Sequence, residues 1–216
     1  MQAGRLTPEL LLRAYAAGVF PMSEAQDDPR VFWGRSRSGG DPAARRVPPV
    51  AVAAQDPAPT RFHLTLDMDF EGVVRGCAER EETWINDAIF RGYFALHRLG
   101  YAHSVEVWEG DDLVGGVYGV ALGRAFFGES MFSRTTDASK IALATLIAHL
   151  RQTGFMLFDT QFTTEHLASL GAIEVPRAEY HAMLDLALSK GAAEILSRPL
   201  PAGDAVVALL TEATSG

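Results

Sequence analysis

The sequence predicts an α+β protein in which a central, largely antiparallel sheet is flanked by helices. Three strand-like segments follow one another at residues 104–108, 113–121 and 124–131, and the short turns 110–112 and 122–123 join them. Such short turns favour an antiparallel meander. The next segment carries apolar residues at positions i, i+3, i+4 and i+7, which is the pattern of a helix. These residues are Leu143, Leu146, Ile147 and Leu150.

The composition is that of a globular protein. The chain has 216 residues, 27 acidic and 19 basic, with a net charge of −8. This charge disfavours a protein that coats nucleic acid through bulk charge, although it allows a local basic patch. The single cysteine, Cys77, cannot form an internal disulfide and is expected to be a small core residue of a helix. With no basic-then-apolar leader and no apolar run of membrane-spanning length, we expect a soluble, cytoplasmic protein.

Residues 1–61 are predicted to form a small N-terminal domain. Thr7-Pro8 can begin a helix, because Thr caps helices and Pro suits the first helical position. Gly18 marks the end of this helix. A short apolar turn at residues 19–22 and the aromatic pair Phe32-Trp33 follow.

Residues 34–60 are rich in Gly, Pro, Ala and Arg and show no period of 2 or 3.6. We expect a long irregular loop here. Its arginines lie either on a solvated loop or on a surface that contacts phosphates. From residue 62 the pattern becomes regular, so residues 62–216 are predicted to form the second domain.

The second domain has strand and helix patterns on both sides of the meander. Polar residues that can cap helices precede three apolar stripes: Asp67 or Asp69, Asn86, and Thr136-Asp137. The other expected elements are strands at 62–66, 155–162 and 173–175, helices at 165–170 and 177–189, and a short element at 206–210.

Acidic and polar residues interrupt two apolar strands. Glu129 lies inside the apolar and aromatic run 124–133, and Asp159 and Gln161 follow the same pattern in the later strand. Burying a carboxylate costs several kcal/mol or more unless it has a partner. These residues are therefore either solvent-facing side chains at strand ends or parts of one polar pocket.

The order of elements looks like that of acetyltransferases that move an acyl group onto an amine. Their signature for the coenzyme A pyrophosphate needs glycine before the long helix, because glycine allows close backbone approach. Residues 132–136 contain no glycine. The acetyltransferase-like pattern is thus present without the usual donor site, and an acyl-CoA-dependent N-acyltransferase is kept as an alternative.

Longer motifs make a more specific resemblance. The chain resembles the bacterial leucyl/phenylalanyl-tRNA–protein transferase family over residues 5–33 and 62–187. The matching segments are residues 11–22, 83–85, 103–108, 113–120, 127–133, 137–140, 159–161, 166–172 and 176–177.

This resemblance implies an aminoacyltransferase that moves Leu or Phe from aminoacyl-tRNA to the α-amine of proteins with N-terminal Arg or Lys. The new residue marks the protein for degradation by the N-degron route. The family fold joins a small N-terminal domain to an acetyltransferase-like C-terminal domain. We expect a monomer without a cofactor, a metal or a membrane partner. A tRNA- or peptide-binding relative that has lost catalysis is the non-enzyme alternative.

The resemblance also assigns the polar residues. Gln161 would accept a hydrogen bond from the attacking amine through its amide oxygen, and Asp159 would orient Gln161. Both would point to one face, since they are two residues apart on the expected strand. A neutral amide is a poor base, so Gln161 is expected to position the amine more than to remove its proton. Glu129 would bind the positively charged acceptor.

Apolar residues are assigned to the donor. The resemblance implies a pocket for the Leu or Phe side chain, although each member could equally be an ordinary core residue. The pocket residues are Phe126, Met131, Leu146, Phe158 and Val117. Trp33 and Trp84 would stack on the 3′-terminal adenosine of tRNA, and burial in the core is the competing interpretation for Trp33.

Residues 34–60 depart from the family, in which a basic helix implicated in tRNA contact is usual. The abrupt change between two matched flanks would also fit a local shift of the reading frame. Phosphate contacts supply much of the affinity for RNA, so this segment bears directly on tRNA binding.

Overall fold

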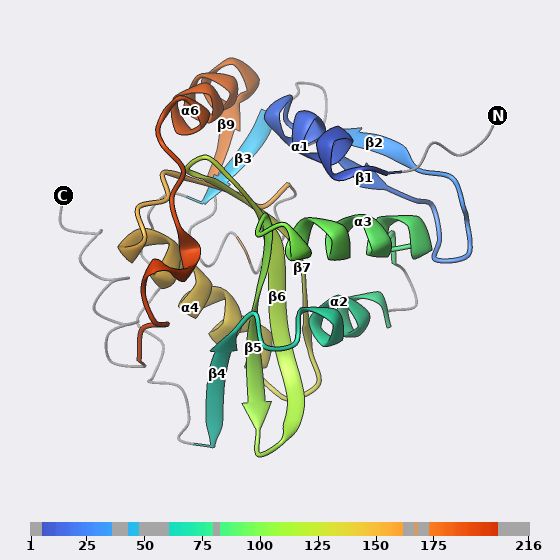
Figure 1. Ribbon diagram of the computed structural model, residues 1–216, viewed down its shortest axis with the longest axis vertical. Coiled ribbons are helices and arrows are strands. Elements are labelled where there is room, and N and C mark those ends of the chain that lie inside the picture. The colour runs from blue at the N-terminus through green and yellow to red at the C-terminus, as the bar shows by residue number, and fades with distance from the viewer. Residues whose placement is uncertain are drawn as a thin grey trace.

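The computed structural model describes residues 6–35, 43–47, 61–79, 83–161, 167 and 173–202. These residues form a seven-stranded sheet, a separate two-stranded sheet and helices around them (Figure 1). The strands of the large sheet, in spatial order, are β4 (Phe62–Leu66), β5 (Ala102–Glu109), β6 (Asp112–Leu122), β7 (Ala125–Ser133), β8 (Leu157–Asp159), β3 (Ala43–Val47) and β9 (Ile173–Pro176).

The small sheet pairs β1 (Val19–Met22) with β2 (Phe32–Arg35) in antiparallel orientation. The helices are α1 (Pro8–Ala16), α2 (Phe70–Ala78), α3 (Asp87–Arg98), α4 (Ala138–Gln152) and α6 (Arg177–Ser189), and a 3-10 turn, η1, spans Ile195–Ser197. The α+β class expected from the sequence is confirmed. The likeness to acetyltransferases and the division near residue 61 stay predictions.

The predicted meander is present, since β5, β6 and β7 pair in antiparallel order. β7 then pairs with β8 in parallel, but only from Ala125 to Phe127. Among the described residues, no strand pairs with the outer edge of β7 beyond Phe127. In this part of the chain β7 therefore continues beyond its pairing with β8.

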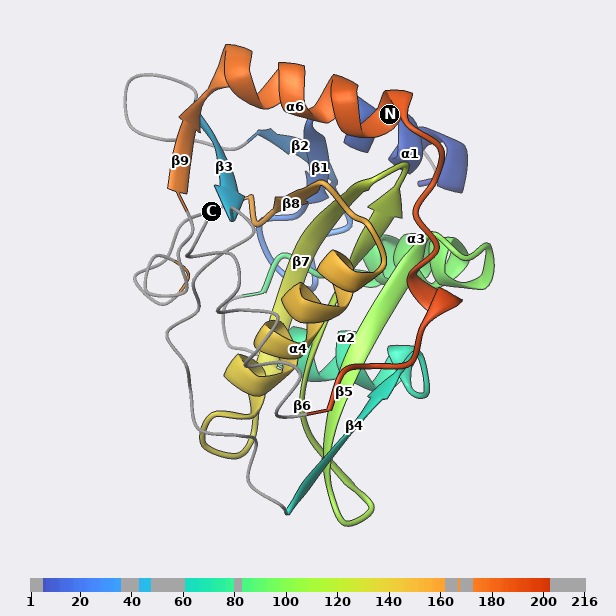
Figure 2. The same cartoon turned by 90° about the vertical axis from the view of Figure 1, so that its left-hand side faces the viewer.

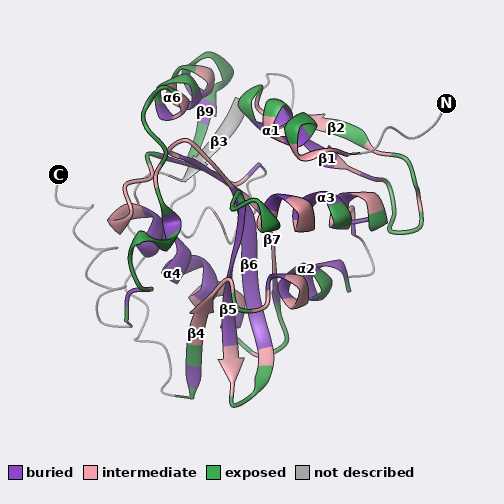
Figure 3. Ribbon diagram, viewed as in Figure 1, coloured by how far each residue is buried: buried purple, intermediate pink, exposed green. Residues whose placement is uncertain are grey.

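Helices cover both faces of the sheet (Figure 2). α2 and α3 pack on one face, in a core that includes Val73, Tyr93, Tyr118 and Phe127. α4 packs on the other face, where its Leu146 lies in a core with Val105, Phe126 and Phe158. The strands of the meander lie between these layers and are buried along most of their length (Figure 3). Cys77 is buried in α2, as expected.

The helix starts follow the predicted capping residues with one exception. The Thr7 hydroxyl accepts from the Leu10 amide, and Asp69 and Asn86 cap α2 and α3 in the same way. Asp137 occupies the cap position of α4 but makes no capping hydrogen bond. Its carboxylate instead accepts from Lys140 at 2.8 Å.

Three element predictions are wrong. Residues 19–22 form a strand rather than a turn, because the segment that contains the aromatic pair Phe32-Trp33 returns to pair with them. Residues 43–47, expected in a loop, form β3, since β8 and β9 supply partners that the local sequence does not reveal. The predicted strand 155–162 shortens to Leu157–Asp159. The predicted elements at 165–170 and 206–210, and most of the loop at 34–60, fall outside the described residues.

The segment after α6 forms a strap, residues 190–202, over the α4 side of the sheet (Figure 2). The Nε2 atom of His149 donates to the carbonyl of Ile195 at 2.6 Å, and Gln152 donates to Nδ1 of the same ring and to the carbonyl of Pro199. Burial lowers the pKa of the His149 ring. Ile195 fills the core beside α4, where it is 2% exposed.

Within the described part of the chain, no helix combines the length and the apolar character needed to cross a membrane.

Candidate active site

Glu129 is buried at the point where β7 leaves β8. Tyr118 pairs with Ser130 and Gly119 with Gly128, so the pairing of β6 with β7 skips Glu129, which forms a β-bulge. Bulges change the direction of a side chain and are common beside active sites. Glu129 is only 6% exposed, so of the two alternatives the solvent-facing strand end is wrong for this residue.

Three side chains surround the Glu129 carboxylate. The Tyr15 hydroxyl of α1 donates to Oε1 at 2.7 Å, and the Tyr93 hydroxyl of α3 donates to Oε2. The amide Nε2 of Gln161 donates to Oε1 at 2.6 Å. No cation contributes to these bonds, so the carboxylate has hydrogen-bond donors but lacks a compensating charge in this set.

This arrangement holds the Glu129 proton tightly. Burial raises the pKa of Glu129 to about 7, against the lowering effect of the Tyr93, Tyr15 and Gln161 hydrogen bonds. The two phenol oxygens also lie 2.9 Å apart. Two phenol protons cannot fill the three oxygen–oxygen contacts among Tyr15, Tyr93 and Glu129, whereas a protonated Glu129 supplies the third. The carboxyl can therefore change charge near neutral pH.

Asp159 and Gln161 meet Glu129, as the sequence predicted, but through different contacts. The Asp159 carboxylate accepts from the backbone N–H of Gln161 at 2.8 Å, and from the Tyr180 hydroxyl of α6 at 2.7 Å. Burial raises the pKa of Asp159 to about 6, despite the Tyr180 bond. Asp159 thus holds the backbone of Gln161, and Glu129 holds its side-chain amide.

Gln161 does not continue the strand. β8 ends at Asp159, and Gln161 has a φ of 61°. This left-handed conformation is uncommon for a residue other than glycine and signals a local constraint. The expectation that Asp159 and Gln161 share one face of a strand is therefore wrong, and a turn brings the two groups together.

Sequence reasoning missed the three tyrosines as site residues. Tyr15 and Tyr93 lie in the apolar stripes of α1 and α3, where an aromatic residue is expected to be an ordinary core residue. Tyr180 lies in α6. A buried Tyr hydroxyl usually finds a polar partner, but the sequence does not tell which one. The pKa of each phenol is raised by burial and by its carboxylate neighbour.

Gly119 makes the bulge possible. A Cβ atom at this position would lie 2.2 Å from the Phe127 carbonyl oxygen and 2.4 Å from the Phe126 ring. We expect Gly119→Ala to lower the free energy of unfolding by about 1–3 kcal/mol through overpacking, measured by urea denaturation. It should also slow any reaction that depends on Glu129.

The matched control for this substitution is Gly191→Ala. No atom lies within 4 Å of a Cβ at Gly191, so stability should stay within about 0.5 kcal/mol of the unsubstituted protein. Equal stability of both variants would show that β6 and β7 can separate without loss at the bulge.

The residues predicted to form the donor pocket lie in one cluster on the α4 face. Val117, Phe126, Leu146 and Phe158 are between 0% and 7% exposed, and Met131 packs against them from the side. The Phe126 and Phe158 rings meet edge to face, with centroids 5.9 Å apart. Their grouping fits both the pocket and the ordinary-core interpretations.

Trp33 is part of the β1–β2 hairpin, and Trp84 contacts the residue that follows β1. Trp33 lies on β2, opposite Pro21 of β1. Its side chain is 39% exposed, so the interpretation of Trp33 as a buried core residue is wrong. The carbonyl of Trp84 accepts from the backbone and the hydroxyl of Ser23, which directly follows β1. The Trp84 ring is partly buried beside the α3 core.

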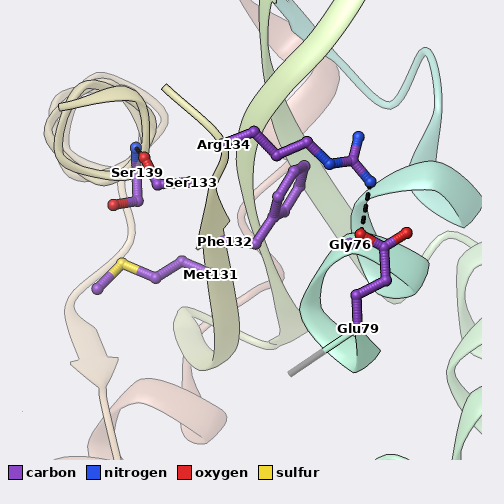
Figure 4. A pocket seen from close by; sticks show the side chains of 7 residues that line it. All are labelled: Gly76, Glu79, Met131, Phe132, Ser133, Arg134 and Ser139. Carbon is purple, nitrogen blue, oxygen red and sulfur yellow. Dashed lines mark hydrogen bonds and ion pairs between the residues drawn. The ribbon is translucent and has the colours of Figure 1, made fainter. Parts of the chain in front are cut away.

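A pocket of about 360 Å³ lies at the far end of β7. Figure 4 shows Met131 and Ser139 on the α4 side of the strand, and Phe132 and Arg134 on the α2 side. Its lining consists of Gly76 of α2, Glu79 directly after that helix, residues 131–134, and Ser139. Met131 therefore belongs both to this pocket and to the predicted donor cluster.

Over the described ranges, no group of three or more His, Cys, Asp or Glu side chains is arranged to hold a metal ion.

Comparison with known proteins identifies the family to which this sequence is similar. A family model described as leucyl/phenylalanyl-tRNA protein transferase matches residues 52–185, and a model of the N-terminal domain of that family matches residues 4–36.

Individual relatives agree with the family models. The leucyl/phenylalanyl-tRNA–protein transferase of Cereibacter sphaeroides is 59% identical over 190 residues, which cover 85% of this chain and 86% of the relative. The proteins of the same name from Dinoroseobacter shibae and Roseobacter denitrificans are 55% and 53% identical, over 91% and 96% of this chain and 88% and 99% of their own. The chain therefore belongs to the leucyl/phenylalanyl-tRNA–protein transferase family.

Proposed function

We propose that this protein transfers Leu or Phe from aminoacyl-tRNA to the α-amine of proteins that begin with Arg or Lys. The observation that carries the proposal is the buried cluster of Glu129, Gln161 and Asp159 where β7 and β8 separate, in a chain of this family. Family membership also favours this reaction over acyl-CoA-dependent transfer and over a non-catalytic role.

The reaction is aminolysis of an ester. The α-amine attacks the ester carbonyl carbon, a C–N bond forms, and the C–O bond to the terminal ribose breaks. The ribose hydroxyl leaves with a proton, and the amine loses one. The ester is already activated, so correct positioning of the amine contributes most of the catalysis the protein must provide.

Gln161 and Asp159 act together on the amine. The Nε2 atom of Gln161 is held by Glu129, which fixes the amide plane and directs the amide oxygen. That oxygen accepts a hydrogen bond from the attacking amine. Asp159 keeps the Gln161 backbone in its left-handed turn and is itself held by Tyr180. Asp159 is thus a positioning residue.

Glu129 binds the positive charge of the acceptor. A guanidinium or ammonium group favours the ionised carboxylate, and the charged pair is strong where water is excluded. Because burial raises the pKa of Glu129 to about 7, acceptor binding should strengthen as the pH rises from 6 to 8. A neutral N-terminal side chain offers no such compensation.

The donor lies along the part of β7 beyond its pairing with β8. Its Leu or Phe side chain enters the cluster of Val117, Phe126, Leu146, Phe158 and Met131, and the adaptable Met131 at the margin suits two side-chain shapes. Trp33 and Trp84 stack on the terminal adenosine. The protein acts as a cytoplasmic monomer, and its products are substrates of the N-degron route.

The test uses radiolabelled Leu-tRNA or Phe-tRNA and a peptide that begins with Arg. We expect labelled peptide, with no requirement for coenzyme A. The same peptide with an acetylated N-terminus is the matched control, because it lacks the attacking amine. Absence of label with both aminoacyl-tRNAs would refute the proposal.

A further inference from the structure

The pocket at the end of β7 has a mixed lining that the proposed reaction does not yet use. Arg134 extends over the Phe132 ring, with its guanidinium carbon 5.2 Å from the ring centroid. Its Nη2 donates to Glu79 at 2.8 Å, and its Nη1 donates to the carbonyl of Leu113. The pocket thus presents a cation, a carboxylate and an apolar surface side by side (Figure 4).

The contact between Arg134 and Glu79 can be exchanged for a ligand. The two side chains are 47% and 61% exposed, and exposed pairs of this kind contribute little to stability. A ligand with a hydrogen-bond donor for Glu79 and an acceptor for Arg134 can replace the pair at small cost. Such a ligand needs no net charge.

Cytosine has this pattern. Its exocyclic N4 amine donates, and carboxylate side chains are its usual partner in proteins. Its neighbouring ring nitrogen and carbonyl oxygen accept, as does the phosphate of its nucleotide, and arginine serves each of these acceptors. Single-stranded RNA bases are read along this edge while they stack on aromatic rings or guanidinium planes. Arg134 on Phe132 provides such a plane.

The location of the pocket matches the direction of the donor. Met131 links the pocket to the cluster proposed for the donor side chain. The chain runs from Glu79 in the pocket to Trp84, the proposed platform for the terminal adenosine, within five residues. Glu129 and Arg134 are five residues apart on β7 and its exit, or about 16 Å in an extended strand. The pocket thus borders the proposed donor cluster through Met131, at the end of β7 that lies beyond Glu129.

We propose that this pocket binds the nucleotide before the terminal adenosine, which is a cytidine in every tRNA. Glu79 accepts from the cytosine amine, Arg134 donates to the cytosine or its phosphate, and Phe132 supports the stacked groups. This assignment rests on the proposed function. It adds a second RNA-reading point at the 3′ end.

The first test measures binding alone. Two RNAs ending in ACCA and ACUA, each carrying phenylalanine through a stable 3′-amide, are titrated by fluorescence anisotropy. Uracil has a carbonyl oxygen where cytosine has the amine, and this oxygen would face the Glu79 carboxylate. We expect the cytidine form to bind about tenfold tighter, as one base contact typically provides. Equal binding of the two RNAs would overturn the proposal.

Variants locate the effect. Glu79→Gln should remove most of the preference for cytidine, because an amide can both donate and accept. Arg134→Ala should weaken both RNAs about tenfold. Arg91→Ala is the matched control, since Arg91 forms an exposed pair with Asp87 on α3. Thermal unfolding checks that all variants are folded. A preference that survives in Glu79→Gln would also contradict the assignment.

A transfer assay separates this proposal from the proposed function. Donors are Phe-tRNA and 3′-O-phenylalanyl adenosine, which lacks the preceding cytidine. The ratio of kcat/KM with Phe-tRNA to kcat/KM with 3′-O-phenylalanyl adenosine should fall about tenfold in Arg134→Ala. The same ratio should stay constant in Arg91→Ala. An unchanged ratio in Arg134→Ala would refute the pocket assignment. If the unsubstituted protein uses neither donor, the proposed function fails, while the binding comparison still decides the pocket.

Discussion

Replacement of Glu129 by glutamine is expected to slow transfer to peptides beginning with Arg or Lys about a hundredfold in kcat/KM. The amide has nearly the shape of the carboxylate: its oxygen can accept from Tyr15 and Gln161, and its NH2 can donate to the Tyr93 oxygen, so the geometry should survive. The charge that binds the acceptor is lost. Measurement of kcat/KM with Arg-, Lys- and Met-initiated peptides checks this expectation.

The pH profile gives an independent view of the same substitution. In both proteins kcat/KM for an Arg-initiated peptide should rise with pH as the attacking α-amine loses its proton, near about pH 8. The unsubstituted protein should show an additional rise that is complete above about pH 7, where Glu129 is ionised. The ratio of kcat/KM between the unsubstituted protein and Glu129→Gln isolates this second rise, because the amine contributes equally to both. The control is Glu71→Gln, at an exposed carboxylate paired with Arg75 on α2. A variant at Glu129 that keeps full preference for basic N-termini would show that this carboxylate does not bind the acceptor.

The same variant should be more stable above neutral pH. The pKa of Glu129 is higher in the folded state than its ordinary value of 4.5, so the folded protein holds this proton more tightly. The resulting stabilisation is complete below about pH 4.5 and is lost as the pH rises to about 7. A shift of this size corresponds to about 3 kcal/mol. Urea denaturation at pH 5 and pH 8 should therefore show a gain for Glu129→Gln only at pH 8.

Removal of the Gln161 side chain is expected to have an effect of similar size on transfer. Gln161 has a left-handed backbone, φ 61°, which glycine adopts without the strain of about 1–2 kcal/mol that a side chain brings. In Gln161→Gly this relief offsets part of the loss of the buried hydrogen bond to Glu129, so the protein should remain folded. Its kcat should fall about a hundredfold, because the amine loses its positioning group.

Companion variants test how Gln161 is held. Asp159→Asn keeps an oxygen that can accept from the backbone N–H of Gln161, but it loses the negative charge. We expect about a tenfold loss of kcat with little change in KM. Asp185→Asn, on an exposed face of α6, serves as the control. Near-normal rates in both Gln161→Gly and Asp159→Asn would remove these two residues from the mechanism.

The sequence predicted elements whose signals are local. The meander follows from short turns between alternating segments, and the starts of α1, α2 and α3 follow from capping residues whose hydrogen bonds span only a few residues. β3 could not be predicted in this way. Its five residues have no strand pattern of their own, and their partners are β8 and β9, more than a hundred residues further along the chain.

The site shows the same division. Glu129, Asp159 and Gln161 could be found because polar residues stand out in apolar strands. Tyr15, Tyr93 and Tyr180 could not, since a phenol on a helix has the same apolar face whether or not its hydroxyl bonds a carboxylate. The bulge at Glu129 depends on Gly119 and Gly128 facing each other across two strands, and that register is a property of the pair rather than of either strand.

The strap over α4 has a consequence for biosynthesis. Ile195 and Leu200 complete a core whose other members begin at Phe62 and include most of α4. During translation, the apolar residues beside His149 stay uncovered after α4 has been made. The roughly 50 residues from Gln152 to Leu200 take about 2–10 seconds to synthesise. Over that interval the nascent chain offers chaperones an apolar surface that the finished protein conceals.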